Sequence, residues 1–145
     1  MRPKLIVCDE AISALDLSNQ AKILNLLLDL KQEFDLSYLF ISHDLSTVRY
    51  FSDDVLVMYR GKIVESGPTK EVFENPKHPY TQLLFSSLPK KHPRETSIPI
   101  VLKEEQTISY GCPFFSKCPI AKSGCQYHSP PWKMVGENHG YSCIH

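Results

Sequence analysis

The distribution of proline limits which parts of this chain can form long regular elements. Of the eleven prolines, only Pro3 precedes position 68, and the other ten lie at or after it. Proline fixes its own φ angle and lacks a backbone N–H, so it interrupts helices and strands. The first 67 residues can therefore form continuous α/β structure, whereas the rest of the chain should consist of short elements joined by turns.

The bulk composition is that of an ordinary globular protein. Hydrophobic residues make up 42% and charged residues 22% of the 145 residues, and the formal net charge is zero. A neutral chain gives no electrostatic reason to expect a nucleic-acid partner. A membrane-spanning helix needs about 18 or more apolar residues in a row, and the apolar runs here, such as Leu5–Cys8, are far shorter. With no apolar signal segment near the N-terminus, we expect a cytosolic protein.

The first part of the chain has the pattern of a strand–helix–strand unit. Leu5–Cys8 and Tyr38–Ile41 are short continuous apolar runs, which are typical of buried parallel strands. Between them, residues 17–34 carry apolar side chains at i, i+4, i+7 and i+11, which predicts an amphipathic helix with Asp16 or Ser18 as its cap. A helical crossover between two strands implies a parallel sheet.

The next elements are predicted to be shorter. In order, we expect a helix at about 45–51, strands at Asp54–Tyr59 and Lys62–Ser66 around a tight turn at Arg60 and Gly61, a helix capped by Thr69, and a helix that opens at His78 and Pro79.

Three regions follow from these patterns. Residues 1–67 form the α/β region, residues 68–109 form a helical extension and linker, and residues 110–145 form a small module that contains cysteine, proline and glycine. The linker itself is predicted over 89–109, where three prolines and mixed charges occur.

Two acids and a histidine are predicted to meet at one edge of the sheet. Asp9 and Glu10 follow the first apolar run, and His43 follows the second. Ligands of open parallel sheets bind outside the carboxyl ends of the strands. One carboxylate can hold Mg²⁺ through its waters, another can deprotonate a water, and an imidazole can contact a phosphate. The alternative stays open that the acids only cap the next helix and that His43 is a surface histidine.

Four ordered stretches within residues 5–65 resemble ABC-transporter ATPases. Leu5–Glu10, followed by Ser13–Asp16, resembles their Walker B strand and D-loop, and Ile41–Leu45 resembles their switch-histidine loop. Val57–Glu65 is similar to the strand pair that closes their catalytic domain. Glu74–Thr81 is similar to the C-terminal extension of the ATP-binding subunits of oligopeptide, dipeptide and nickel importers. The resemblance covers essentially the whole chain.

The resemblance implies a fold, a function and partners. The fold would be α/β, the C-terminal portion of the parallel sheet and helices of a P-loop NTPase, followed by a small cysteine- and proline-rich extension. The function would be ATP binding and hydrolysis that energises peptide import. Membrane-spanning permease subunits and a second ATP-binding subunit would be the partners. The chain would then lie in the cytoplasm, peripheral on the inner face of the cell membrane.

The resemblance also assigns roles to individual residues. Asp9 would hold Mg²⁺, Glu10 would be the general base for the hydrolytic water, and His43 would contact the γ-phosphate of ATP. Asp16 would lie in the D-loop, which meets the second ATP-binding subunit. At position 11 the family usually has proline and this chain has Ala11, which we expect to have a small effect because no catalytic group is lost.

The phosphate-binding loop of the family is missing from this sequence. No G-x-x-x-x-G-K-S/T motif occurs, and neither the glutamine loop nor the Ser-Gly-Gly signature is found. Such a loop supplies the backbone N–H cradle and the lysine for the phosphates. We therefore expect a truncated subunit that binds ATP weakly and is inactive by itself. A split subunit completed elsewhere, a non-catalytic metal-binding module and a non-functional gene fragment remain alternatives.

Four of the five cysteines are clustered near the end of the sequence. Cys112, Cys118, Cys125 and Cys143 have the spacing C-x5-C-x6-C-x17-C. Four thiolates suit a [4Fe–4S] cluster or a zinc site, and unliganded structural cysteines are the third possibility. The C-terminal region of the peptide-importer ATPases is similar, and some members carry an iron–sulfur cluster there, which favours the cluster.

The remaining cysteine and the nearby histidines are assigned no chemistry. Cys8 lies in the first apolar run and should behave as a small hydrophobic residue. His128, His139 and His145 are expected to be solvated loop residues, because four cysteines already complete a metal site. For His78 and Tyr80, packing at a helix start is the expected role.

Overall fold

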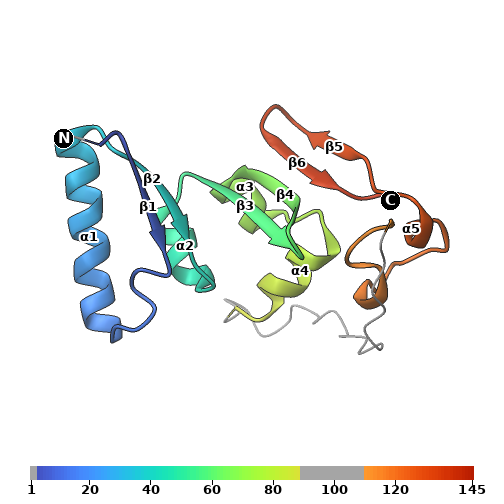
Figure 1. Ribbon diagram of the computed structural model, residues 1–145, viewed down its shortest axis with the longest axis horizontal. Coiled ribbons are helices and arrows are strands. Elements are labelled where there is room, and N and C mark those ends of the chain that lie inside the picture. Colours follow the sequence, from blue (N-terminus) through green and yellow to red (C-terminus); the bar gives the residue numbers. More distant parts are fainter. Residues whose placement is uncertain (1–2, 89–109) are drawn as a thin grey trace. The chain divides into compact units, whose positions relative to one another are not determined.

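The computed structural model describes residues 3–88 and 110–145. The chain divides into two compact units, one that ends at Ser52 and one that begins at Asp53. The elements of both units are labelled in Figure 1. The linker predicted over 89–109 lies outside the described residues, and the predicted division into three regions stays a prediction.

The first unit is the strand–helix–strand unit that the sequence predicts. It contains, in order, β1 (Leu5–Asp9), α1 (Leu17–Phe34), β2 (Ser37–Ile41) and α2 (Leu45–Phe51). The two strands pair in parallel, in register from Leu5 with Ser37 to Asp9 with Ile41. The α/β fold class is therefore confirmed, with α1 as the crossover helix between the strands (Figure 1).

The ends of α1 have identifiable causes. The side chain of Asp16 accepts a hydrogen bond from the backbone N–H of Asn19, so Asp16 rather than Ser18 is the N-cap. At the other end Asp35 takes up φ +51°, and its N–H bonds to the carbonyl of Lys31. A left-handed residue at this place is a common way to stop a helix.

The described residues cover one face of the β1–β2 pair and leave the other exposed. Tyr38 and Phe40 pack against Phe51 of α2, with ring centroids 5.6 and 4.9 Å apart, in a cluster with Ile12 and Leu24. Side chains alternate between the faces of a strand, and the opposite face is exposed. That face carries Leu5, Val7, Leu39 and Ile41, which are 56%, 58%, 47% and 45% exposed.

The exposed face corrects one prediction. Both apolar runs were expected to form fully buried strands, but Cys8 is the buried residue of β1. Its burial agrees with the predicted role of a small hydrophobic residue, and burial also raises the pKa of its thiol. In a fully buried parallel sheet both faces of the strands are covered. In the described part of this unit, the core packs only on the face that carries Tyr38 and Phe40.

The second unit is built on an antiparallel sheet. Its strands are β3 (Asp54–Tyr59), β4 (Lys62–Pro68), β5 (Trp132–Val135) and β6 (His139–Ser142). Its helices are α3 (Thr69–Glu74), α4 (Pro79–Ser86), the 3-10 helix η1 (Phe115–Lys117) and α5 (Gly124–Tyr127). The strand order is β3-β4-β6-β5, so the C-terminal hairpin extends the sheet that the earlier hairpin begins.

The turn between β3 and β4 is the predicted one. Arg60 and Gly61 take up φ angles of +47° and +75°. Two successive positive φ angles are those of a type I′ turn, whose twist suits a hairpin. By contrast, the pairing of Glu65 with Tyr141 joins β4 to β6, and no local sequence pattern indicates it.

The starts of α3 and α4 differ in their capping. Thr69 was predicted to cap α3, but Pro68 occupies the N-cap without a side-chain bond, and Thr69 is the first helical residue and is buried. In α4 the Nδ1 atom of His78 accepts the N–H of Tyr80, and Pro79 follows as the first helical residue. Proline suits this position because its missing N–H would have no helical partner.

The cysteine-bearing segment shares a core with β3 and α4. Phe114 is 1% exposed, and its ring centroid lies 5.2 Å from that of Tyr59 and 5.4 Å from that of Tyr80. Cys112 and Cys125 belong to the same cluster. Edge-on and tilted aromatic contacts at such distances are favourable beyond their buried area.

The β5–β6 hairpin is held by a close contact across its strands. Trp132 lies against Gly140, where an added Cβ would collide with the indole ring. The indole Nε1–H also donates to the sulfur of Met134 at 3.2 Å. Gly140 is therefore required by close approach rather than by its φ angle.

Among the helices of the described residues, none combines the length and the apolar character needed to span a lipid bilayer.

Candidate functional site

The predicted meeting of an acid and a histidine at the sheet edge is present in the first unit. The Nδ1 atom of His43 lies 3.0 Å from Oε1 of Glu10. The backbone N–H of Glu10 bonds to the carbonyl of Ile41 at 3.0 Å, so the parallel pairing continues to the residue that carries the acid. The two side chains are 55% and 74% exposed for Glu10 and His43.

Glu10 occupies an uncommon backbone conformation. Its φ angle is +46°, in the left-handed region that non-glycine residues rarely adopt. Ser13 supports this turn, since its backbone N–H and its hydroxyl both donate to the carbonyl of Glu10, at 3.2 and 2.9 Å. Residues in this region occur at functional sites and also in turns and helix ends, as at Asp35 and Arg60 of this chain.

The loop that carries His43 is fixed by its neighbour Asp44. The Asp44 carboxylate caps α2 by accepting the N–H of Ser46 at 2.9 Å and the hydroxyl of Thr47 at 2.6 Å. The Thr47 hydroxyl, followed by the backbone N–H of Ser46, lowers the pKa of Asp44. Ser42 accepts the N–H of Asp44 at 3.1 Å. Both residues flanking His43 are thus held in place.

The other two acids predicted for this site have different surroundings. Asp9 shares the exposed face of β1 with Leu5 and Val7. The carboxylate of Asp16 is occupied by Asn19, through its backbone N–H at 3.0 Å and its side-chain amide at 2.7 Å. These bonds, the backbone one first, lower the pKa of Asp16. The structure therefore brings Glu10 and His43 together and uses Asp16 as a helix cap.

The four predicted metal ligands gather in the second unit. Cys112 and Cys118 flank η1, Cys125 lies in α5, and Cys143 follows β6. The N–H of Cys112 bonds to the carbonyl of Cys125 at 2.8 Å. Cys112, Cys125 and Cys143 are buried and Cys118 is half-buried.

Two of these thiols, Cys112 and Cys118, have a raised pKa. Burial, followed by the charges of Cys112, Cys143 and Cys125, raises the pKa of Cys118 to about 11. Burial is also the first cause of the raised pKa of Cys112. Backbone N–H groups act in the opposite direction, from Phe114 and Phe115 on Cys112 and from Ile120 on Cys118.

The predicted metal site is nevertheless not formed as a compact ligand set. Within residues 3–88 and 110–145, no three or more histidine, cysteine, aspartate or glutamate side chains are grouped closely enough to hold a metal ion.

Two of the histidines expected in solvated loops have specific partners instead. His139 is 2% exposed on β6, and its Nε2 atom lies 2.7 Å from Oε1 of Glu65. The Nε2 atom of His145 lies 3.4 Å from the sulfur of Cys125. The prediction was wrong for His139 because the strand pairing that buries it connects residues distant in sequence. His128, by contrast, is exposed.

A buried carboxylate in the second unit was missed by sequence reasoning. Glu65 is fully buried and accepts the backbone N–H groups of Lys77 and His78, at 2.7 and 2.8 Å, besides its contact with His139. His78 is itself 1% exposed, and burial lowers its pKa to about 4. No local sequence signal indicates its burial, because Glu65 and its neighbour Val64 point to opposite faces of β4 and both are buried.

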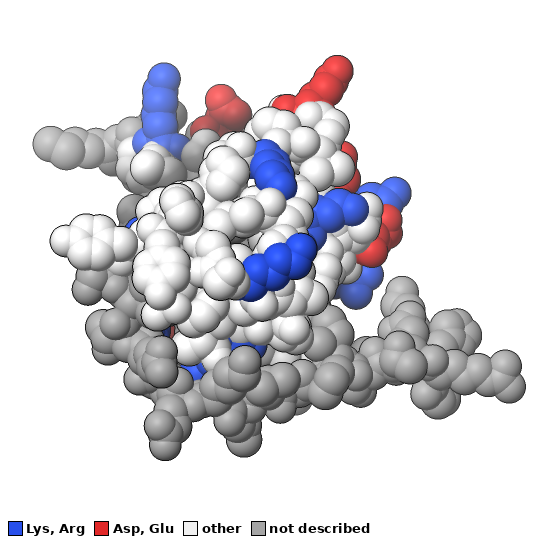
Figure 2. Space-filling model, turned by 90° about the vertical axis from the view of Figure 1, so that its right-hand side faces the viewer, with Lys and Arg blue, Asp and Glu red and all other residues white. Residues whose placement is uncertain are grey.

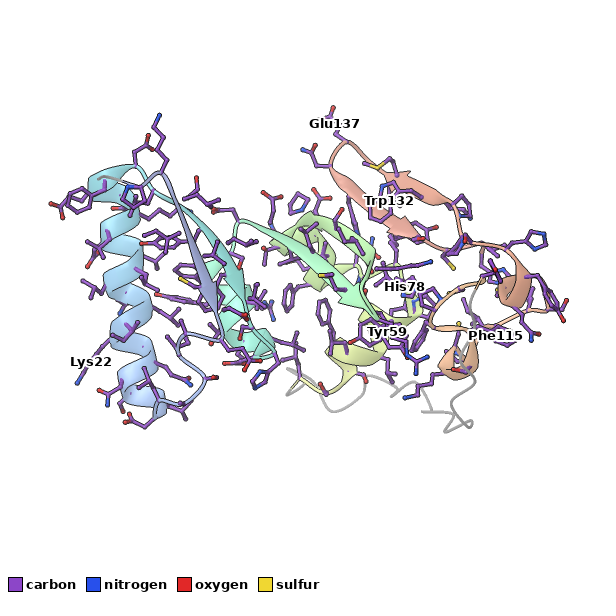
Figure 3. All side chains as sticks on the ribbon, in the orientation of Figure 1. Lys22, Tyr59, His78, Phe115, Trp132 and Glu137 are labelled. Atoms are coloured by element: carbon purple, nitrogen blue, oxygen red, sulfur yellow. The ribbon has the colours of Figure 1, made fainter. Side chains whose placement is uncertain are left out.

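The figures place these groups in the second unit. In Figure 3, His78 and Tyr59 lie in the same part of this unit, in agreement with the contacts of both rings with Phe114 at 5.9 and 5.2 Å.

On the face shown in Figure 2, Lys and Arg side chains are scattered among uncharged residues, with Asp and Glu toward the edge. The described part of that face carries no dense patch of one charge.

Comparison with known proteins agrees with the resemblance seen in the sequence. A family model described as the C-terminal region of oligopeptide/dipeptide transporters matches residues 64–125. The oligopeptide transport ATP-binding protein AppF of Bacillus subtilis is 46% identical over 149 aligned residues, which cover 99% of this chain and 45% of the relative. The di/tripeptide transport ATP-binding protein DppF of Pseudomonas aeruginosa is 42% identical, covering 100% and 46%.

This chain is similar to the C-terminal part of oligopeptide and dipeptide transport ATP-binding proteins. It spans about half the length of the curated relatives it matches. The family match begins beside Glu65 and ends at Cys125, so it includes the buried carboxylate and three of the four clustered cysteines. One solved structure, cbiO1 of Clostridium perfringens, described as part of the ABC transporter complex cbiONQ, is 32% identical over 50% of this chain and 29% of its own, with a TM-score of 0.47.

Proposed function

We propose that this chain is part of an ATP-hydrolysing subunit of a peptide-importing ABC transporter. The observation that carries the proposal is the 3.0 Å contact between Glu10 and His43 at the carboxyl ends of two parallel strands, in a chain that is similar to these transport proteins. Membrane-spanning permease subunits and a second ATP-binding subunit would be its partners, and it would act at the inner face of the cell membrane.

The proposed mechanism assigns separate tasks to the residues of the first unit. The carboxylate of Glu10 would accept a proton from the water that attacks the γ-phosphate, and His43 would orient Glu10 through Nδ1 and contact the phosphate. Asp9 would bind Mg²⁺, which neutralises phosphate charge when it is bound. Asp16 would meet the second subunit while its carboxylate caps α1.

The residues present fit only one side of a nucleotide site. Phosphoryl transfer depends on positioning and on charge stabilisation by a phosphate-binding loop, and this sequence has none. The exposure of Glu10 and His43 agrees with an incomplete site. We therefore expect hydrolysis only when another polypeptide, or another part of the same polypeptide, supplies that loop.

Complementation tests this proposal. The chain would be co-expressed with the part of the Bacillus subtilis relative that it does not match, and ATP hydrolysis would be measured for each polypeptide and for the mixture. We expect activity in the mixture alone and a loss of about 100-fold or more for Glu10→Gln, with Glu33→Gln, an exposed acid on α1, as the control. Hydrolysis that Glu10→Gln leaves unchanged would contradict the role of Glu10.

A second candidate function is metal binding by the four cysteines. Supporting it are the donor set of four neighbouring sulfurs and the backbone N–H groups directed at Cys112 and Cys118, since such donors stabilise metal-bound thiolates. The spacing C-x5-C-x6-C-x17-C favours a [4Fe–4S] cluster over zinc, because zinc sites usually use closely spaced C-x2-4-C pairs and this sequence has none.

Metal analysis of the chain tests this second function. The protein would be purified anaerobically, and iron, sulfide and zinc would be quantified beside the visible absorption spectrum. We expect iron and sulfide in equal amounts, lost in Cys118→Ser and retained in Cys8→Ser, whose cysteine lies in β1. Stoichiometric zinc without iron would replace the cluster by a zinc site. An insoluble chain without metal would favour a non-functional gene fragment.

A further inference from the structure

The loop between β1 and α1 is bound by a side chain of the helix that follows it. Gln20 of α1 donates from Nε2 to the backbone carbonyl of Ile12 and to that of Leu15, both at 3.1 Å. A side-chain amide has two N–H donors, so these bonds use both of them. The amide of Gln20 therefore joins two carbonyls of this loop to α1.

Packing of the same loop on α1 supports these bonds. Ile12 is 4% exposed and belongs to the same core cluster as Leu24 of α1. Leu24 follows Gln20 by about one helical turn, so both side chains lie on one face of the helix. The loop is thus attached to α1 through the side chain of Ile12 as well as through its carbonyl.

This loop begins at Glu10, whose side chain contacts His43. The φ angle of Glu10 is +46°, and a non-glycine residue keeps such an angle only where the surrounding structure determines it. Ser13 bonds to the carbonyl of Glu10 from within the loop. The bonds from Gln20 reach back five and eight residues along the chain, and they connect the loop to a regular helix.

We propose that Gln20 is a positioning residue for ATP hydrolysis, because its hold on the loop keeps the carboxylate of Glu10 beside His43, 3.0 Å away. The inference rests on the function proposed above, in which Glu10 accepts a proton from the attacking water. Without the two bonds, the backbone of Glu10 can leave the left-handed region, and its carboxylate then occupies the productive position for less of the time. Misplacement of a catalytic group by about 1 Å is enough to slow a reaction strongly.

Gln20→Glu tests this role with little change of shape. An ionised carboxylate only accepts hydrogen bonds, so the variant loses both donors to the loop. Gln32→Glu is the matched control, since Gln32 is an exposed residue of the same helix. Circular dichroism would check that α1 stays formed in both variants.

The first measurement uses the full chain by itself. The NMR signals of the His43 imidazole report its contact with Glu10, and Glu10→Gln shows how they change when the carboxylate is lost. We expect Gln20→Glu to shift these signals in the direction of Glu10→Gln, and Gln32→Glu to match the wild type. His43 signals of Gln20→Glu that equal those of the wild type would overturn the inference.

The second measurement is hydrolysis in the complemented mixture described above. Gln20→Glu should lower kcat about tenfold and leave the KM for ATP unchanged, because the bonds of Gln20 go to backbone oxygens of the loop. Combined with Glu10→Gln, it should cause no further loss, since a residue that acts only through Glu10 then has no carboxylate to position. A further tenfold loss in the double variant would indicate a general structural role and would overturn the inference.

The two measurements separate failure of this inference from failure of the proposed function. A wild-type mixture that does not hydrolyse ATP would overturn the proposed function. The His43 signals of the chain alone would then decide whether Gln20 positions Glu10, because they require neither ATP nor a second polypeptide.

Discussion

The two units of this protein place similar pairs of side chains in opposite environments. In the first, Glu10 and His43 are 3.0 Å apart with side chains 55% and 74% exposed. In the second, Glu65 and His139 are 2.7 Å apart with side chains 0% and 3% exposed. The contact is nearly the same, but an exposed pair contributes little to stability, whereas a buried pair is strongly destabilising when one member is removed. The exposed pair is thus accessible to a ligand, and the buried pair connects segments of the fold.

The largest expected effect comes from removing the buried acid. Glu65→Ala would leave the N–H groups of Lys77 and His78, and the ring of His139, without their acceptor. We expect the free energy of unfolding of the second unit to fall by about 3–5 kcal/mol, measured by denaturant titration. Glu71→Ala is the matched control, since the Glu71 side chain is 56% exposed and lies 4.0 Å from His139. Equal effects of the two substitutions would contradict the distinction between buried and exposed acids.

The second effect is a pH dependence that arises from His78. Burial lowers the pKa of its imidazole from an ordinary value of 6.5 to about 4. Between these values the unfolded chain binds a proton that the folded chain does not. Stability is therefore fully present above pH 6.5 and is lost as the pH falls toward 4. The loss between pH 7 and pH 5 should be about 2 kcal/mol.

Substitution of His78 checks the origin of that dependence. Asparagine keeps an acceptor for the N–H of Tyr80 at the start of α4, but it does not titrate in this range. The slope of unfolding free energy against pH should therefore flatten in His78→Asn and stay unchanged in His128→Asn, where the histidine is exposed. An unchanged slope in His78→Asn would assign the pH dependence to other groups.

A smaller effect is expected at the cap of α2 in the first unit. Asp44→Ala removes the acceptor for the N–H of Ser46 and the hydroxyl of Thr47. This should lower the free energy of unfolding of the first unit by about 1 kcal/mol. Asp44→Asn keeps a side-chain oxygen at the cap and should cost less, so that equal losses for both variants would count against capping as the cause.

The smallest effect is expected at the exposed pair. His43→Ala should change the free energy of unfolding by less than about 1 kcal/mol, because both partners are solvated. His139→Ala, which removes the buried counterpart, should cost several times more in the same assay. A large loss of stability in His43→Ala would show that the exposed pair holds the first unit together and would remove the contrast between the two units.

The first unit could be predicted closely from the sequence because its signals are local. The apolar periodicity over residues 17–34 and the helix expected at 45–51 coincide with α1 and α2. The meeting of Glu10 with His43 followed from parallel pairing alone, since parallel strands end at the same edge of a sheet. The exposure of Leu5 and Val7 was not predicted, because an apolar run does not indicate which of its faces finds a partner.

In the second unit, the features that could not be predicted depend on pairing between residues that are distant in sequence. Its hairpin at Arg60 and Gly61 was predicted, but the pairing of β4 with β6 joins Glu65 to Tyr141 across most of the unit. That pairing buries His139, which the sequence had indicated as a solvated residue. The cysteines illustrate the same limit, because their spacing gives the number of ligands but not the distances between sulfurs.

The contact between Trp132 and the neighbouring strand has a consequence for spectroscopy. Trp132 is the single tryptophan of the chain, and its indole lies against Gly140 and bonds to the sulfur of Met134. Tryptophan fluorescence of this protein therefore originates entirely in the β5–β6 hairpin. Emission would report the separation of that hairpin during unfolding, and the first unit, which contains no tryptophan, would not contribute to it.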